Sequence, residues 1–532
     1  MQAGGQSLAY AYDALGRVTA ETSSVLTKSY AYRTVNGRTC DLVSTLSYTK
    51  ANGTSLLSLS YTYDAAGNIQ TVSKSGTVYY QYAYDELGQL IREDNKDANK
   101  SYTYTYDSRG NLLSKKTYAF TLGTLGTAQK TDSYGYATDS WKDRLTSYNG
   151  QTITYDSIGN PLTYNNGSAY TFTWEGRQMQ SASKGNQTYS YTYNSDGLRA
   201  SKTVGNTTYH YYWNSGKLIA MTYDDHYMIF TYTESGTPFS VTCYDAYLDK
   251  EYECLYITNL QGDVVGIYDA AKSSMVISYT YDAWGRLVGK DGTSSDYAQL
   301  EMNNPLLYRG YQYDYETGFY YLQSRYYDPS VGRFLNADSV LSIHPSSSEC
   351  NLFRYCNNNP INRIDETGTM AVAVATSGAT YAAFVAWLST LGSANFWNPV
   401  GWIILGVIAA GVITWAAVTL YNRWKASAAS KTRTLSDVSA KEPVNGKYYL
   451  AYIDKSGSLV KIGNAMSFTV ALSFLGIKKA SGSLSKRYRV SISRPNNVTK
   501  EWGIYTTKQI DAKALAIVLG CTASPEVHGS YM

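Results

Sequence analysis

A short unit recurs along the first part of the chain and restricts its fold more than any other sequence feature. The unit reads Tyr-x-Tyr-Asp-x-x-Gly, usually followed by Asn, Arg or Gln and then by an aliphatic residue. Its copies are Tyr12–Gly16, Tyr63–Gly67, Tyr84–Gly88, Tyr106–Gly110, Tyr155–Gly159 and Tyr281–Gly285, with a variant at Tyr193–Gly197. Self-similarity at a short spacing is typical of repeat architectures, in which each repeat packs on its neighbours.

The unit predicts a β-hairpin. Tyr102, Tyr104 and Tyr106 alternate with polar residues, so a strand would place all three on one face. Aspartate at the first and glycine at the fourth turn position favour a type I turn, after which the aliphatic residue starts the return strand. Tyrosine occurs 55 times and phenylalanine 11 times, which suits a surface that is apolar along the ring and wet at the hydroxyl. The chain is therefore expected to be mainly β, with stacked hairpins that cover each other's edges.

This unit resembles the YD repeat of Rhs proteins, teneurins and insecticidal toxin-complex proteins. The resemblance implies that residues 1–304 form a β-hairpin spiral that closes into a hollow shell. An unrelated tyrosine-rich β-solenoid is the alternative. The sequence starts almost directly with a repeat and shows no signal peptide, so we read its start as a cut into a longer array.

Residues 305–368 resemble the Rhs-associated core, the segment that ends the shell and precedes a variable C-terminal domain. The similarity extends in order over four stretches, residues 309–314, 316–329, 332–338 and 357–360. In several members of the family this segment is an aspartyl protease that cuts its own chain.

By that resemblance, Asp338 and Asp365 are the candidate catalytic residues, with Arg333 as a charge partner. Paired carboxylates can divide the roles of general acid and base. The cut would fall just after Gly368, near Thr369–Met370. The prolines that follow both aspartates in the family are replaced here by Ser339 and Glu366, and the alternative is that the two aspartates only cap turns.

Residues 369–422 contain no charged side chain. Two apolar runs, Met370–Leu391 and Val400–Tyr421, are each long enough to cross a hydrocarbon layer about 30 Å thick as a helix. We predict a hydrophobic helical hairpin over residues 369–425 with the membrane as its partner. It would either anchor the protein or stay packed in the shell until delivery; a buried hairpin without any membrane contact is the alternative.

A polar linker, residues 426–445, leads to a small α+β domain over residues 446–532. Residues 431–532 carry 15 Lys/Arg and 6 Asp/Glu, and the rest of the chain carries 31 and 36. This basic balance suits nucleic acid or an acidic membrane surface. By position the domain resembles the toxin tip of Rhs proteins, with His528 as a candidate general base; a histidine near a terminus is more often without such a role. The sequence stops abruptly after it, so we expect a truncated tip.

Two functions of different classes fit this organisation. The first is the terminal part of a secreted or surface-bound bacterial polymorphic toxin, whose shell carries its own C-terminal domain as cargo and whose producer holds an immunity protein. The second is a non-enzymatic surface protein that binds carbohydrate through its aromatic shell; a decayed fragment without function is the third reading. The six cysteines and four histidines show no zinc-type spacing, so no cofactor is expected.

Overall fold

A computed structural model describes residues 2–3, 6–139, 141–292, 294–339, 351–369 and 371–373, together with five strands near the C-terminus. The chain divides into two compact units. One comprises Met1–Tyr211 and Met228–Gly378, and the other comprises Tyr212–Tyr227 and Ala379–Met532. The first unit contains the repeats and the core segment.

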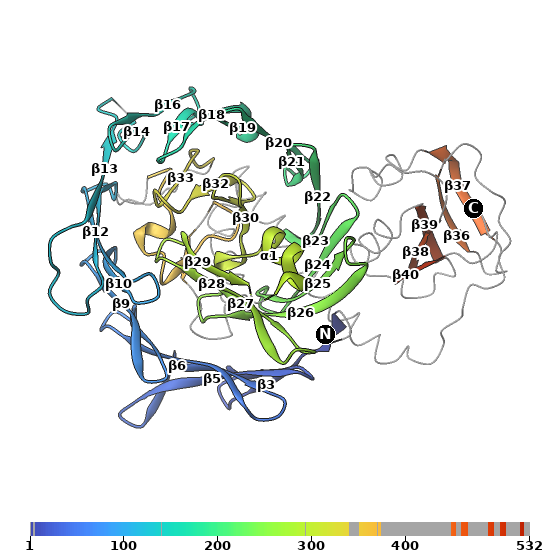
Figure 1. Ribbon diagram of the computed structural model, residues 1–532, viewed down its shortest axis with the longest axis horizontal. Helices are drawn as coiled ribbons and strands as arrows, with labels where there is room; N and C mark the ends of the chain where they lie inside the picture. Colours follow the sequence, from blue (N-terminus) through green and yellow to red (C-terminus); the bar gives the residue numbers. More distant parts are fainter. Residues whose placement is uncertain are drawn as a thin grey trace, which may run out of the picture. The chain divides into compact units, whose positions relative to one another are not determined.

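The repeats form two long antiparallel sheets in which neighbours in the chain are neighbours in the sheet. The first sheet contains β3 (Ala9–Tyr12), β4 (Val18–Thr22), β5 (Leu26–Val35), β6 (Arg38–Lys50), β7 (Ser55–Tyr63), β8 (Ile69–Lys74), β9 (Thr77–Tyr84), β10 (Leu90–Asn95), β11 (Lys100–Tyr106), β12 (Leu112–Ala119), β13 (Lys130–Tyr136), β14 (Leu145–Tyr148) and β15 (Gln151–Thr152). Wholly or in part within the first unit, the second sheet contains β16 (Thr154–Tyr155), β17 (Pro161–Asn165), β18 (Ala169–Glu175), β19 (Gln178–Lys184), β20 (Gln187–Tyr193), β21 (Arg199–Val204), β22 (Thr207–Asn214), β24 (His226–Tyr232), β25 (Pro238–Asp245), β26 (Lys250–Thr258), β27 (Val264–Asp269), β28 (Ser274–Tyr281) and β29 (Leu287–Gly292). These two sheets, here called the wall, curve around the core segment (Figure 1).

Each repeat folds as the predicted hairpin. In the repeat at Tyr63, the Asp64 carboxylate accepts hydrogen bonds from the backbone of Ala66 at 2.9 Å and of Asn68 at 2.8 Å. Gly67 has φ +84°, a conformation that glycine adopts without strain. The register of β7 and β8 shifts by one residue at Tyr63, as in a β-bulge beside a turn.

The hydroxyl of the last tyrosine in the unit explains why tyrosine is used rather than phenylalanine. In five of the copies it donates a hydrogen bond to a backbone carbonyl of the preceding hairpin, and so ties neighbouring repeats together. These bonds join Tyr63 to Val43, Tyr84 to Ile69, Tyr106 to Leu90, Tyr193 to Met179 and Tyr281 to Val264, at 2.6–2.8 Å. Tyr136, which lies outside the repeat copies, binds the Leu112 carbonyl in the same way at 2.8 Å.

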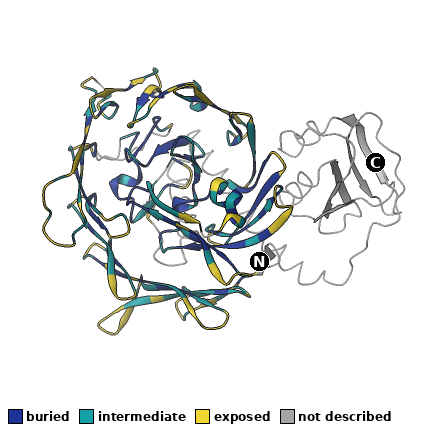
Figure 2. Cartoon of the chain, in the orientation of Figure 1, coloured by how far each residue is buried: buried dark blue, intermediate teal, exposed yellow. Residues whose placement is uncertain are grey.

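A short helical stretch, η1 (Ser295–Tyr297) and α1 (Ala298–Asn303), precedes the core segment, which forms a small sheet inside the curve of the wall. The elements of the core segment are η2 (Tyr308–Gly310), β30 (Gln312–Asp314), β31 (Phe319–Leu322), β32 (Arg325–Asp328), β33 (Arg333–Phe334), η3 (Cys356–Asn358) and β34 (Arg363–Ile364), and β35 (Val372–Ala373) follows it. All residues of β31, β32 and β33 are buried, and Figure 2 shows this darker centre against the partly exposed wall. The core segment therefore supplies the apolar interior on which the wall packs.

Asparagines near the end of the core segment bind the turns of successive repeats. Asn362 accepts a hydrogen bond from the backbone of Ile69 at 2.8 Å, and Asn359 donates to Asn68 at 3.1 Å. Asn358 donates to Gln89 and to the Gly110 carbonyl, both at 2.8 Å. We call Asn351, Asn358, Asn359 and Asn362 the asparagine row, because Asn351 continues the series with Asn111 at 2.8 Å.

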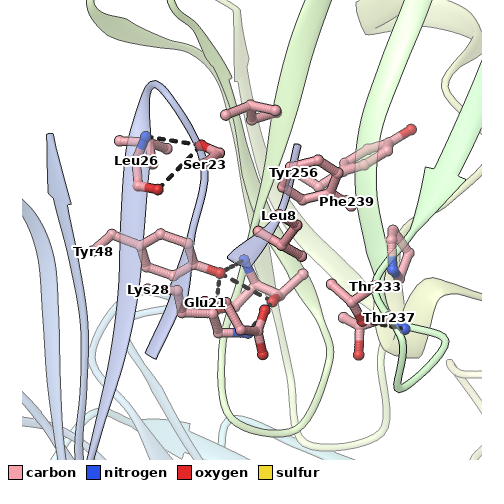
Figure 3. A pocket seen from close by; sticks show the side chains of 13 residues that line it. Leu8, Glu21, Ser23, Leu26, Lys28, Tyr48, Thr233, Thr237, Phe239 and Tyr256 are labelled. Atoms are coloured by element: carbon pink, nitrogen blue, oxygen red, sulfur yellow. Dashed lines mark hydrogen bonds between the residues drawn. The ribbon is translucent and has the colours of Figure 1, made fainter. Parts of the chain in front are cut away.

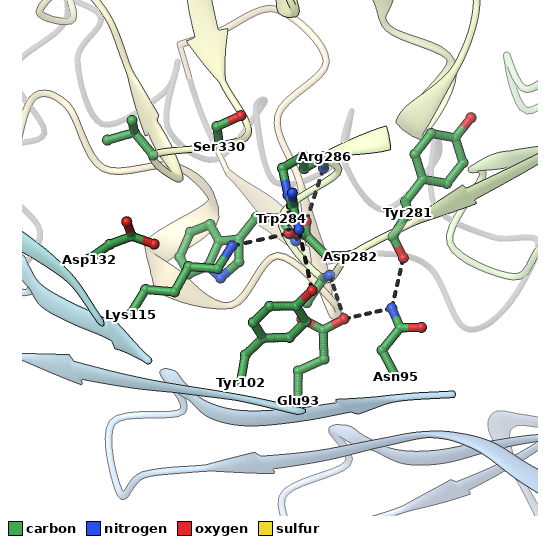
Figure 4. Close-up of polar contacts among 12 residues, drawn as sticks. Glu93, Asn95, Tyr102, Lys115, Asp132, Tyr281, Asp282, Trp284, Arg286 and Ser330 are labelled. Carbon is green, nitrogen blue, oxygen red and sulfur yellow. Dashed lines mark hydrogen bonds and ion pairs between the residues drawn. The ribbon is translucent and has the colours of Figure 1, made fainter. Parts of the chain in front are cut away.

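Two further contacts join strands of the first sheet to the turn after β28, which is distant from them in sequence. Glu93 on β10 accepts a hydrogen bond from the backbone of Ala283 at 2.9 Å, and Lys115 on β12 pairs with Asp282 at 3.1 Å (Figure 4). A pocket lies between the first strands of the wall and strands β25 and β26, with the turn that precedes β25 at its edge (Figure 3). There the Lys28 ammonium donates to Thr258 Oγ1 at 2.9 Å.

The second unit contains β23 (Lys217–Tyr223) and a five-stranded sheet near the C-terminus. That sheet has the order β37 (Leu459–Met466), β36 (Tyr448–Ile453), β39 (Glu501–Thr506), β38 (Tyr488–Ser493) and β40 (Thr522–Pro525). The predicted hydrophobic hairpin lies almost wholly outside the described residues. Among the helices that the structure does describe, none is long and apolar enough to span a membrane.

Candidate active site

Asp338 and Asp365 meet at one guanidinium group. Arg325 Nη2 lies 2.9 Å from Asp338 Oδ2 and 3.2 Å from Asp365 Oδ2. The three side chains are nearly buried, with exposed fractions of 5% for Arg325, 10% for Asp338 and 2% for Asp365. The two aspartates that the sequence singled out are therefore side by side, although 26 residues separate them.

The backbone around each carboxylate is fixed by neighbouring elements. The Asp338 amide donates to the Leu352 carbonyl at 2.9 Å, and Arg325 Nη1 donates to the same carbonyl at 3.0 Å. The Asp365 amide donates to the Tyr311 hydroxyl at 2.9 Å. These contacts place Asp338 in the loop after β33 and Asp365 directly after β34, both against the first residue of β32.

Arg325 is held in an apolar setting. Its guanidinium carbon lies 3.5 Å from the centre of the Phe334 ring. Burial lowers the pKa of the Arg325 guanidinium, whereas the Asp338 and Asp365 carboxylates act in the opposite direction and favour its charged form. Buried groups of opposite charge that shift each other's pKa are common in active sites, so this cluster of one guanidinium and two carboxylates is a candidate catalytic site.

A single peptide bond next to this site forms hydrogen bonds through both its carbonyl and its amide group. The Gly368 carbonyl accepts a hydrogen bond from Arg325 Nε, and the Thr369 amide donates to Asp365 Oδ1 at 3.0 Å. Strands β34 and β35 pair on either side of this segment, so that it forms a closed loop over the site. The Gly368–Thr369 bond is thus the peptide bond that both Arg325 and Asp365 contact.

Arg333, the charge partner suggested by the sequence, does not take that position. Its guanidinium donates to the Tyr136 hydroxyl at 3.0 Å and to the Asp143 carbonyl at 2.6 Å, and it forms no ion pair with a described residue. Arg325 was missed, although it directly precedes the Tyr-Tyr-Asp-Pro stretch of the core motif. His528 lies outside the described residues, so its role stays a prediction.

Asp365 also keeps a turn-capping contact. One oxygen accepts the amide of Thr369, four residues on, as Asp64 accepts that of Asn68. In the repeat the second oxygen binds the side chain of Asn68, whereas in Asp365 it binds Arg325. The turn contact and the ion pair therefore coexist. In the repeats at Asp13 and Asp282 the second oxygen also binds an arginine, but that arginine belongs to the same turn, whereas Arg325 lies 40 residues before Asp365.

Comparison with known proteins points to a single family. The teneurin YD-shell family model matches residues 39–361. The tRNA3(Ser)-specific nuclease WapA of Bacillus spizizenii is 31% identical over 384 residues, which cover 70% of this chain and 15% of that protein. The tRNA nuclease WapA of Bacillus subtilis is 29% identical over 56% of this chain and 12% of its own length. The chain thus spans about one seventh of the length of these relatives.

Solved structures agree on the fold. The TcdB2-TccC3-TEV crystal structure matches 68% of this chain and 19% of its own chain, with a TM-score of 0.52 and 19% identity. The Photorhabdus luminescens Tc holotoxin pore structure matches 69% of this chain and 19% of its own, with a TM-score of 0.53 and 19% identity. At this level of identity the comparison concerns the architecture alone.

Proposed function

The chain belongs to the teneurin YD-shell family, and from this premise we propose that its shell carries a C-terminal effector domain and releases it by cutting its own chain. Two features of the chain support this proposal: the shell fold, and the pair of carboxylates, Asp338 and Asp365, at the end of the shell. Relatives named as tRNA nucleases support a toxin, and the basic balance of residues 431–532 suits a nucleic-acid target. We further propose that the protein acts outside its producer, which an immunity protein would protect.

The observation that carries the proposal is that Arg325 and Asp365 both contact the Gly368–Thr369 bond, while Asp338 pairs with the same Arg325 guanidinium. In the proposed reaction Asp338 takes a proton from a water molecule, whose oxygen attacks the Gly368 carbonyl carbon. The Arg325 Nε–H stabilises the negative charge that develops on the carbonyl oxygen. Asp365 enters this step in its protonated form and gives its proton to the Thr369 nitrogen as the C–N bond breaks. It then takes the proton of the new Gly368 carboxylic acid, and Asp338 passes the proton that it took from water to the Thr369 amine through solvent. The products are a Gly368 carboxylate and a Thr369 ammonium group.

Cleavage is tested on the purified full chain by intact mass and by N-terminal sequencing. The expected products are residues 1–368 and residues 369–532, the second starting at Thr369. Asp338→Asn and Asp365→Asn should leave the chain whole. Asp64→Asn is the matched control, because Asp64 caps a turn in the same way without contacting Arg325. A wild-type chain that stays whole, or variants that are cut equally well, would contradict the proposal.

The effector is tested by growth of cells that express the full chain. Wild-type chain should slow growth, and the two uncleaved variants should do so less, because the domain then stays attached to the shell. Equal and normal growth of all three strains would count against a toxic domain.

A further inference from the structure

The turn between β31 and β32 forms hydrogen bonds with the backbone of Thr367, just before the proposed cleavage point. The Thr367 carbonyl accepts two hydrogen bonds from Ser324, one from its Oγ at 2.6 Å and one from its amide at 3.2 Å. The next residue, Arg325, binds the next carbonyl, that of Gly368. Two consecutive residues of the turn therefore hold two consecutive carbonyls.

Position 368 accepts only glycine without strain. Gly368 has φ +72°, and a Cβ built there would lie 2.7 Å from the Leu322 carbonyl oxygen and 2.8 Å from Ser324 Oγ. It would also lie 3.2 Å from the Arg325 amide nitrogen. Two of these three atoms belong to the backbone of the β31–β32 turn, which cannot move aside as a flexible side chain could.

We infer that residues 322–325 form a substrate cradle, which selects a left-handed glycine before the bond to be cut and in which Ser324 is a positioning residue. The inference rests on the proposed self-cleavage and specifies its substrate. The hydrogen bonds of Ser324 go to the Thr367 and Leu322 carbonyls and not to the two residues of the bond to be cut, so Ser324 acts through the backbone. By fixing the Thr367 carbonyl, it prevents the Gly368 carbonyl from rotating away from Arg325.

The cradle is tested by rates and by the position of the cut in the full chain. Ser324→Ala removes one of the two donors and should slow cleavage about fivefold to tenfold, as expected for one lost hydrogen bond. The shape of the pH–rate profile should not change, because Ser324 carries no proton in the reaction, and Ser324→Thr should restore most of the rate. Gly368→Ala should abolish cleavage at this bond, whereas Thr367→Ala, a neighbouring control, should not.

The possible outcomes distinguish failure of the cradle hypothesis from failure of the self-cleavage hypothesis. Melting temperatures are compared in the Asp338→Asn background, where no variant is cut, so that misfolding is recognised. If the wild-type chain stays whole, the proposed function fails. If it is cut but Ser324→Ala and Gly368→Ala are cut at the same bond and rate, the cradle alone is overturned. Total loss of cleavage in a normally folded Ser324→Ala chain would also overturn it, because the hydroxyl would then be a reacting group.

Discussion

Arg199 on β21 and Asp314 on β30 face each other through two hydrogen bonds of 2.6 and 2.9 Å, and neither side chain is exposed at all. Lys202 adds a contact with Asp314 at 3.1 Å. Burial opposes ionisation, but Arg199 and Lys202 together hold the pKa of Asp314 below its usual value. This bidentate pair joins the wall to the core segment, far from the candidate active site in sequence.

Asp314→Asn is expected to destabilise the fold strongly. Removing one charge leaves the Arg199 guanidinium buried without its ionised partner, which costs about 3–5 kcal/mol. Urea unfolding of the full chain, followed by tryptophan fluorescence, measures the change. Asp296→Asn is the control, since the Lys272–Asp296 pair is 3.9 Å long and both side chains are largely exposed. Equal unfolding midpoints for the two variants would contradict the expectation.

Tyr106→Phe should lower the free energy of unfolding by about 1 kcal/mol, because the hydroxyl bond to the Leu90 carbonyl is lost. Tyr12 occupies the same place in the first repeat but is 54% exposed. Tyr12→Phe should therefore leave stability unchanged. The two variants are compared by urea unfolding under identical conditions, and a similar loss in both would refute the role given to the hydroxyl.

Glu93 should make the stability depend on pH. Burial and the nearby Asp282 carboxylate raise the pKa of Glu93 from 4.5 to about 7. The folded chain thus binds a proton here, between about pH 4.5 and 7, that the unfolded chain has released. Stability contributed by this group is complete below pH 4.5 and is lost as the pH rises towards 7.

Glu93→Gln, which cannot titrate, should reduce the difference between the unfolding free energies at pH 5 and pH 7.5. The exposed Glu86 provides a matched control, and Glu86→Gln should keep the wild-type difference. An unaltered pH dependence in Glu93→Gln would show that other groups cause it.

Asn358→Gly tests how much the side-chain amide of one member of the asparagine row contributes to stability. Glycine retains the left-handed backbone, which has φ +58° at Asn358, but it cannot donate to Gln89 and Gly110. We expect a loss of about 1–3 kcal/mol, the cost of leaving buried acceptors without a donor. Asn36→Gly is the control, because Asn36 has φ +51° in an exposed hairpin. Equal melting temperatures for Asn358→Gly and Asn36→Gly would argue against a stabilising role of the asparagine row.

The sequence was most informative where contacts are local. The alternation at Tyr102–Tyr106 and the spacing from Asp64 to Gly67 predicted the strands and turns, and the family model confirms the YD-shell assignment. The mainly β character is likewise confirmed. The domain boundaries, the membrane hairpin and the role of His528 stay predictions.

Long-range contacts left little trace in the sequence. The resemblance indicated Asp338 and Asp365, but it did not indicate that Arg325 would lie between them. The same holds for Asn362, whose partner Ile69 is 293 residues earlier. Periodicity reports which face of a strand is buried, whereas the choice between Arg325 and Arg333 depends on how the core segment turns inside the wall.

The asparagine row also sets an order of events during synthesis. The turns at Gly67, Gly88 and Gly110 leave the ribosome some 250 to 290 residues before the amides that bind them. Hairpins can form as they emerge, but their turns stay exposed to water until residues 351–362 have been made and can bind them. The curvature of the nascent sheet is therefore fixed only after residues 351–362 have been made, immediately before the segment that contains the Gly368–Thr369 bond.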